Sequence, residues 1–210
     1  MTRERGILFS APMVRALLAG RKTQTRRVVK LASLRESTMT PYEWELTEND
    51  GRITAYTTPQ LVEAKSPYGG AGDRLWVRET FTHVTGNGIR VHYRADGEPT
   101  DRDGNTLSTE PGLRRWMPSI FMPRKESRIT LNILHVSIQR LMSITDEDAR
   151  AEGVTPFVHD PEGDCWTARP DVHRSAFEHL WGDINGWIGP KSWASNPLVW
   201  VVKFSRVANP

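Results

Sequence analysis

The first pattern of apolar positions along this chain has helical spacing. Met13, Leu17 and Leu18 recur at intervals that place them on one face of a helix. The stripe begins after Ser10, a residue type that often precedes a helix, and stops before Gly20, a residue type that often follows one. We therefore predict a helix between Ser10 and Gly20, with one buried face.

Two further segments have helical patterns. Residues 145–153 open with a Thr that has an Asp three residues later, and they end with a Gly, which is typical of a short helix with both ends defined. Residues 171–184 place three large apolar side chains on one helical face. These side chains are Phe177, Trp181 and Ile184.

Strand patterns occupy four other segments. Residues 74–81 and 89–94 alternate between apolar and polar positions, and the glycine-containing stretch between them predicts a hairpin. Residues 198–207 are apolar on both faces, as in a buried strand. Residues 127–141 alternate with a change of phase near Leu134, which predicts a long strand with a bulge or bend.

The remaining segments are polar and rich in turn-forming residues. They lie at about 31–70, 95–120 and 155–195, and we interpret them as loop insertions. Several strands with short helices between them indicate an α+β fold. We expect a single domain over residues 1–210, built as a small mixed β-barrel with short helices and long loop insertions.

Composition narrows the class of protein. No apolar run approaches the roughly 20 residues that span a bilayer, and the N-terminus lacks a signal-peptide pattern, so we expect a cytoplasmic protein without a membrane partner. The single cysteine, Cys165, excludes an internal disulfide. The histidines show no metal-ligand spacing and no nucleotide-binding glycine motif is present, so we expect neither a metal nor a cofactor.

Positive charge is concentrated at one end of the chain. The net charge is only +3, yet eight of the first 30 residues are Arg or Lys, against the single acidic residue Glu4. A local basic cluster on a nearly neutral protein indicates a site for an anion rather than a surface that coats nucleic acid. Arg also binds phosphate through two hydrogen bonds and stacks on bases.

The segment GRKTQTRR, residues 20–27, contains a candidate catalytic pair. A hydroxyl such as that of Thr25 becomes a nucleophile when a base takes its proton, and Lys22 can be that base if burial and nearby cations lower its pKa. The neighbouring cations are Arg21, Arg26 and Arg27. The spacing alone equally fits a loop that contacts phosphate, or a basic loop in solvent.

Two acidic residues stand in unusual positions. Glu152 lies in the last turn of its predicted helix, where the helix dipole disfavours a negative charge. Glu79 falls on the apolar face of its predicted strand, so it needs a partner, for which an arginine is suited. Either residue also fits a structural role at the end of its element.

The tryptophans are numerous and have two interpretations. Trp181 and Trp200 fit the core, whereas Trp187 and Trp193 lie in a predicted loop. A loop tryptophan can stack on a nucleic-acid base, or it can close the end of a barrel.

Taken together, four ordered motifs resemble the ASCH domain, a small β-barrel related to the PUA fold of RNA-modifying proteins. LLAGRKTQTRR resembles the family's helix-ending basic motif, and GDRLWVRET its G-D-x-L strand. DARAEG resembles its short helix, and VWVVKF its closing strand. The chain is about twice as long as the compact family domain and resembles the longer type found in phages and prophages.

The resemblance implies a function and a set of site residues. Small bacterial ASCH proteins are amidohydrolases that deacetylate N4-acetylcytidine, and their catalytic residues fall on Lys22, Thr25 and Glu152. We expect a modified nucleoside or RNA, including single-stranded nucleic acid, as the partner. The substrate-binding residues expected beside these three are Arg21, Arg26, Arg27, Trp76, Glu79, Arg124, Trp193 and Asn196. The alternatives are a non-catalytic RNA-binding module and a metal-independent ribonuclease.

Overall fold

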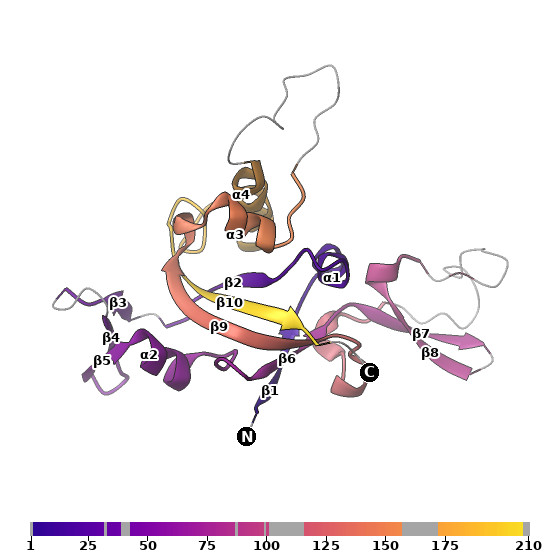
Figure 1. The fold of residues 1–210 in the computed structure, drawn as a ribbon, viewed down its shortest axis with the longest axis horizontal. Helices are drawn as coiled ribbons and strands as arrows, with labels where there is room; N and C mark the ends of the chain where they lie inside the picture. The colour runs from indigo at the N-terminus through magenta and orange to yellow at the C-terminus, as the bar shows by residue number, and fades with distance from the viewer. Residues whose placement is uncertain are drawn as a thin grey trace, which may run out of the picture.

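A five-stranded sheet forms the centre of the computed structural model of this chain (Figure 1). The structure describes residues 2–31, 33–38, 43–86, 88–98, 100, 116–156 and 172–207. The strands of the central sheet are β1 (Glu4–Leu8), β2 (Gln24–Val28), β6 (Arg74–Arg78), β9 (Thr130–Arg140) and β10 (Leu198–Arg206). Their order is β1-β6-β9-β10-β2; β1 and β6 are parallel, and the other neighbours are antiparallel.

The longest strand, β9, bends where the sequence predicts. His135 pairs with Lys203 and Ile133 pairs with Phe204, so Leu134 is an extra residue on its strand. Leu134 is 54% exposed, because the extra residue turns its side chain out of the core. A bulge of this kind bends its strand and increases the twist. The curvature of β9 in Figure 1 carries β10 and β2 around toward β1.

The prediction of a closed barrel is wrong for the described part of the chain. β1 and β2 are the two edges of the central sheet, and no ladder joins them. The gap is bridged instead by a side chain: Arg27 Nη2 donates to the Leu8 carbonyl at 2.8 Å. The edges stay apart because the chain leaves β1 directly into the helix α1 (Ala11–Leu18), and Arg27 occupies the space between the strands. The pocket described below opens at this gap between the two edge strands.

The sheet is buried on both faces. Trp200, Val202 and Phe204 of β10 face a large core cluster that includes α1, and Val199 and Val201 face a second cluster under two helices. Those helices are α3 (Asp146–Ala151) and α4 (Val172–Asn185), which lie together on one side of the sheet in Figure 1. Burial on both faces confirms the prediction of a buried strand at residues 198–207.

The helices confirm the sequence pattern except at Leu18 of α1, which is 37% exposed, and at one residue of α4. Phe177 and Trp181 of α4 are buried as expected, whereas Ile184 is 51% exposed. Ile184 lies in the last turn of α4, where the helix extends to the mouth of the pocket described below. Thr145 caps α3, accepting a hydrogen bond from the Asp148 amide at 3.1 Å.

The first predicted loop insertion is largely ordered. Residues 31–70 contain a small antiparallel sheet of β3 (Leu34–Glu36), β4 (Glu43–Thr47) and β5 (Ile53–Thr57), followed by α2 (Thr58–Lys65). The interpretation as a loop is therefore wrong here. The apolar content is low because few side chains of this segment are fully buried, among them Leu46 of β4 and Leu61 of α2.

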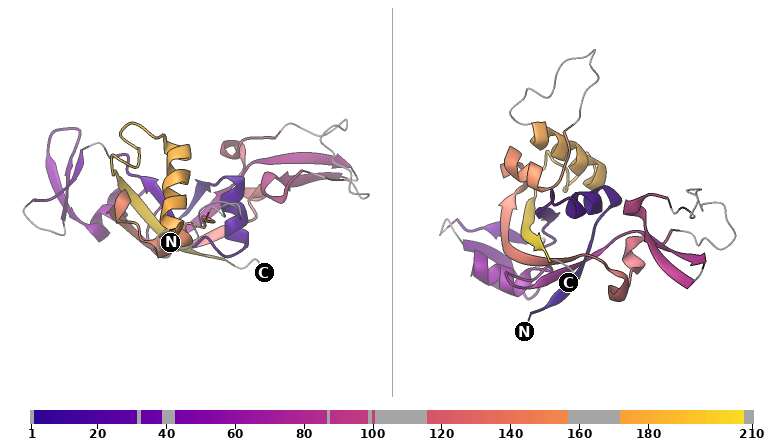
Figure 2. Two further views of the ribbon diagram at one scale, coloured as in Figure 1. Left: turned by 90° about the horizontal axis from the view of Figure 1, so that it is seen from above. Right: turned by 45° about the vertical axis from the view of Figure 1, so that its right-hand side comes forward.

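The predicted hairpin is displaced along the chain. Its strands are β7 (Phe81–Gly86) and β8 (Gly88–Tyr93), whereas β6 belongs to the central sheet. Figure 2 shows this hairpin and the small β3–β5 sheet on opposite sides of the central sheet. Short 3₁₀ helices complete the described part, at Arg94–Asp96, Ser119–Phe121, Arg124–Glu126 and Leu141–Ser143. Much of the two other expected insertions, at residues 101–115 and 157–171, lies outside the described residues.

Candidate functional site

The basic segment after α1 wraps around the end of that helix. Gly20 adopts a positive φ of 70°, and the amides of Arg21 and Lys22 both donate to the Ala16 carbonyl, at 2.9 and 3.1 Å. The Thr23 amide then donates to Ala151 of α3 at 2.8 Å. These bonds bring the segment under α3, so its lysine points into the protein rather than into solvent.

Lys22 and Glu152 form a buried ion pair. Lys22 Nζ lies 2.9 Å from Glu152 Oε2 and donates to the Glu152 carbonyl at 2.8 Å. The side chains are 0% and 3% exposed. Glu152 is the C-cap residue of α3, so the lysine compensates both the carboxylate and the negative end of the helix dipole. The unusual position of Glu152 is thus explained by its partner.

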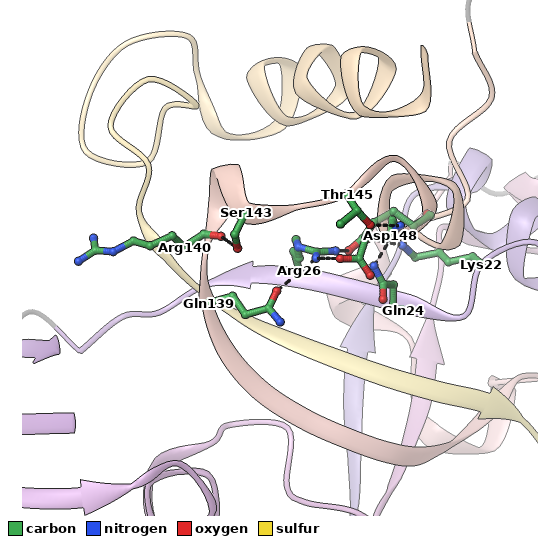
Figure 3. A network of polar contacts seen from close by, with 9 residues as sticks. Lys22, Gln24, Arg26, Gln139, Arg140, Ser143, Thr145 and Asp148 are labelled. Atoms are coloured by element: carbon green, nitrogen blue, oxygen red, sulfur yellow. Dashed lines mark hydrogen bonds and ion pairs between the residues drawn. The ribbon is translucent and has the colours of Figure 1, made fainter. Parts of the chain in front are cut away.

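Arg26 extends this pair into a network (Figure 3). Its Nη1 lies 3.3 Å from Glu152 Oε1, and its Nη2 lies 2.8 Å from Asp148 Oδ2. Gln24 Nε2 donates to the Asp148 carbonyl at 2.8 Å. Asp148 and Glu152 share one face of α3 because they are four residues apart, and Gln24 and Arg26 share one face of β2 because they are two apart. The helical repeat of α3 and the two-residue repeat of β2 therefore place the side chains of this network opposite one another.

Burial and charge act together on the lysine. Burial lowers the pKa of Lys22 below its ordinary value, and the nearby Arg27 and Arg26 lower it further, while the Glu152 carboxylate opposes the shift. Burial alone would raise the pKa of Asp148, yet the Arg26 guanidinium outweighs it and holds that pKa below its usual range. Lys22 therefore loses its proton more readily than a lysine in solvent.

Gly153 is required for the close approach of α3 to the lysine segment. Its φ is 82°, and a Cβ at this position would lie 2.8 Å from Lys22 Cβ and from Ala16 Cβ. We expect Gly153→Ala to destabilise the protein by about 2–4 kcal/mol, from the left-handed backbone and the overlap together. Urea unfolding followed by tryptophan fluorescence measures the loss.

Gly20→Ala is a matched control for that substitution. Gly20 also has a positive φ, of 70°, but a Cβ there meets nothing within 4 Å. We expect Gly20→Ala to lower the free energy of unfolding only by the cost of the left-handed backbone, about 1–2 kcal/mol. Equal losses in the two variants would contradict the close packing at Gly153.

A pocket of about 430 Å³ opens between the edges of the central sheet. Thr25, Arg26 and Arg27 of β2 line it together with Glu152. Lys22 lies behind Glu152 and is not part of the lining. The apolar wall comes from β1, α1 and α4 and from a tyrosine before β6. Its residues are Ile7, Leu8, Met13, Tyr68, Phe177, Leu180, Trp181 and Ile184.

The pocket therefore brings together Thr25, Glu152, Arg26 and Arg27 among the residues expected from the sequence. Arg21 lies outside it and is exposed, with Nη1 3.3 Å from Thr155 Oγ1 and 3.4 Å from the Gly153 carbonyl.

The expected residues around β6 lie elsewhere and have local partners. Glu79 has the arginine partner that its position requires, because Arg128 contacts both of its carboxylate oxygens, at 2.9 and 3.0 Å. The ring of Trp76 lies beside the Arg78 guanidinium, 5.2 Å from its centre. Arg124 is paired with Glu4 at 2.8 Å. None of these side chains lines the pocket.

The two expected residues after α4, Trp193 and Asn196, also have structural partners within the fold. Trp193 is only 8% exposed, with its ring 6.3 Å from that of Phe177 and the Arg174 guanidinium over it. Asn196 Oδ1 accepts a hydrogen bond from the Met142 amide at 2.8 Å. Of the two interpretations of Trp193, the structure therefore agrees with packing inside the fold.

Sequence reasoning missed several residues of the site. Asp148 fits the first turn of a helix, where acidic residues are common, and only its spacing of four residues from Glu152 signals a shared face. Lys30 and Lys191 also line the pocket; Lys30 belongs to the basic cluster of the first 30 residues, and no local motif marks Lys191. Within the described ranges, no group of three His, Cys, Asp or Glu side chains is placed to hold a metal ion. No helix in the described part is long and apolar enough to cross a bilayer.

Comparison with known proteins gives one structural match. No protein-family model matches the sequence, and no curated protein matches it. A solved structure does match, the ASCH domain from Lactobacillus crispatus JV V101, with 13% sequence identity and a TM-score of 0.35. The match covers 97% of this chain and 79% of that chain.

Proposed function

We propose that this protein hydrolyses an amide or acyl bond on a modified base, of the N4-acetylcytidine type, with Lys22, Thr25 and Glu152. One observation carries the proposal. Thr25 and Glu152 come from distant parts of the sequence and line the same pocket, and the fully buried Lys22 amine is bonded to Glu152 directly behind it. The resemblance of the sequence motifs to ASCH amidohydrolases favours the same three residues.

The hydrogen bonds of Lys22 suit it to accept a proton. A neutral amine has two N–H groups and one lone pair. Glu152 supplies two acceptors for Lys22 Nζ, its carbonyl and its Oε2. With both N–H groups donated to Glu152, the lone pair of the neutral amine is left to accept the Thr25 proton. Glu152 thus orients the base.

The reaction then takes two steps. In the first, Thr25 Oγ1 attacks the acyl carbonyl as its proton passes to Lys22, and Arg27 stabilises the oxyanion. The C–N bond breaks, and the amine leaves with the proton returned from Lys22. In the second, water attacks the acyl-threonine ester and releases the carboxylic acid, so Thr25 recovers its proton.

Hydrolysis of N4-acetylcytidine tests this proposal. Release of cytidine and acetate is followed by chromatography with mass detection. We expect Lys22→Met and Thr25→Val each to lower kcat by about 10³-fold or more, because each removes a group that acts in the chemical step. Thr23→Val is the matched control, since Thr23 is an exposed threonine of the same segment. Thr25→Val retaining the rate of Thr23→Val would exclude Thr25 as the nucleophile.

A binding module without catalysis is the second candidate, favoured by the excess of cations along the pocket. It predicts that folded wild type binds RNA but releases no cytidine. Binding should then survive Thr25→Val, weaken on Arg27→Gln and fall as salt rises.

A further inference from the structure

We infer that the pocket takes a phosphorylated ligand, with a base against its aromatic wall and a phosphate against Lys30 and Lys191. This inference rests on the proposed function, and it specifies the substrate as a nucleotide or a nucleotide residue rather than a neutral nucleoside.

The first support is the charge of the lining. Among the described residues that line the pocket, the charged side chains are those of Arg26, Arg27, Lys30, Lys191 and Glu152. Glu152 is the one carboxylate among them, and it is already contacted by two cations, Lys22 and Arg26. Arg26 in turn contacts Asp148. The buried network thus contains two cations and two carboxylates and is neutral as a whole.

Three cations are left without a carboxylate. Lys30 and Lys191 are exposed, and neither forms an ion pair with a carboxylate in the described part of the chain. Arg27 lies over the Phe9 ring and uses Nη2 for the Leu8 carbonyl, so its contacts are with neutral groups. A neutral ligand would leave this excess charge uncompensated, whereas a phosphate would compensate it with charge-assisted hydrogen bonds.

The second support is the position of the cations relative to the aromatic wall. Trp181 lines the pocket, and its Nε1 donates to the Lys191 carbonyl at 2.8 Å, which ties the backbone of Lys191 to the ring. Tyr68 lies on the pocket near Arg27, whose charge opposes the rise that burial causes in the Tyr68 pKa. An aromatic surface beside cations matches a base joined through its sugar to a phosphate.

The inference is tested first by binding, with unmodified ligands that cannot be hydrolysed. Titration calorimetry compares cytidine, cytidine 5′-monophosphate and a short single-stranded RNA at low salt. We expect the phosphorylated ligands to bind at least about tenfold more tightly than cytidine. The double variant Lys30→Gln/Lys191→Gln should lose this preference, and Lys125→Gln, an exposed lysine outside the pocket, should keep it.

Hydrolysis supplies the second arm and identifies the source of the phosphate. The substrates are N4-acetylcytidine, its 5′-monophosphate and a short RNA that contains one N4-acetylcytidine. A higher kcat/KM for the monophosphate identifies a free nucleotide, and a higher kcat/KM for the RNA alone identifies a polynucleotide. In the double variant, the preference for the phosphorylated substrates should be lost, whereas Lys125→Gln, outside the pocket, should keep it.

The outcomes separate the inference from the proposed function. Preferential binding of phosphorylated ligands without any hydrolysis would sustain the phosphate site and contradict the hydrolase. Hydrolysis of N4-acetylcytidine with equal or tighter binding of neutral cytidine would sustain the hydrolase and overturn the phosphate site. A preference for phosphate that survives in the lysine double variant would also overturn it.

Discussion

Replacing Glu152 by alanine should destabilise the protein by about 3–5 kcal/mol at pH 7, because the change leaves buried cations without their carboxylate. Lys22 has a fully buried side chain and would keep the carbonyl of residue 152 as its hydrogen-bond acceptor, with no carboxylate to balance its charge. Arg26 would keep Asp148. Urea denaturation measured by tryptophan fluorescence and by circular dichroism gives the loss in free energy of unfolding.

Two further variants locate the cause of this loss. Glu147→Ala removes an exposed carboxylate from the same helix, and we expect it to cost less than about 1 kcal/mol. Lys22→Met/Glu152→Ala removes both members of the pair, so its loss should be clearly smaller than the sum of the single losses. A strictly additive double variant would show that Lys22 and Glu152 do not interact.

Local patterns predicted the elements that hold this pair. The helix before Gly20, the cap at Thr145 and the bulge at Leu134 all follow from neighbouring residues, and all are confirmed. The position of Glu152 at the unfavourable end of its helix also marked it as unusual. Local patterns succeed here because helix ends and strand phases depend on residues within a few positions of one another.

The network itself could not be predicted from local patterns. Arg26 appears in the sequence as part of a basic run, yet its partners are more than 100 residues away on β9 and α3. The barrel failed to close for a similar reason, since pairing of β1 with β2 depends on how far β9 bends and on Arg27 filling the gap. The sheet at residues 31–70 was missed because Leu46 alone among its described strand residues is buried, so its apolar signal is weak.

The rate of N4-acetylcytidine hydrolysis should rise with pH and level off with an apparent pKa below 10.5, the ordinary value for lysine. The proton acceptor has to be neutral, so kcat/KM is low where Lys22 is an ammonium ion and high where it has lost its proton. Burial lowers the pKa of Lys22, and the guanidinium groups of Arg27 and Arg26 lower it further. The rising limb therefore lies at lower pH than for a solvent-exposed lysine.

Under the proposed mechanism, we expect Arg26 to set the pH of this rising limb through its effect on Lys22, as a positioning residue that does not touch the substrate. Arg26 Nη1 contacts Glu152 Oε1, so Lys22 shares the Glu152 carboxylate with a second cation. Arg26→Met removes this cation and leaves the carboxylate to Lys22, so the Lys22 pKa should rise. Each unit of that rise lowers kcat/KM about tenfold at any pH on the rising limb.

Arg26→Lys is the conservative control, because it retains the positive charge beside Glu152 and should keep the limb close to its wild-type position. The profiles are measured from pH 5 to pH 10 on variants whose folding has been verified by circular dichroism. Rates of Arg26→Met that recover at high pH would show that the residue acts through the protonation of Lys22. A uniform loss at every pH, or a limb displaced to lower pH, would instead mean that Arg26 does not tune the base and serves the fold alone.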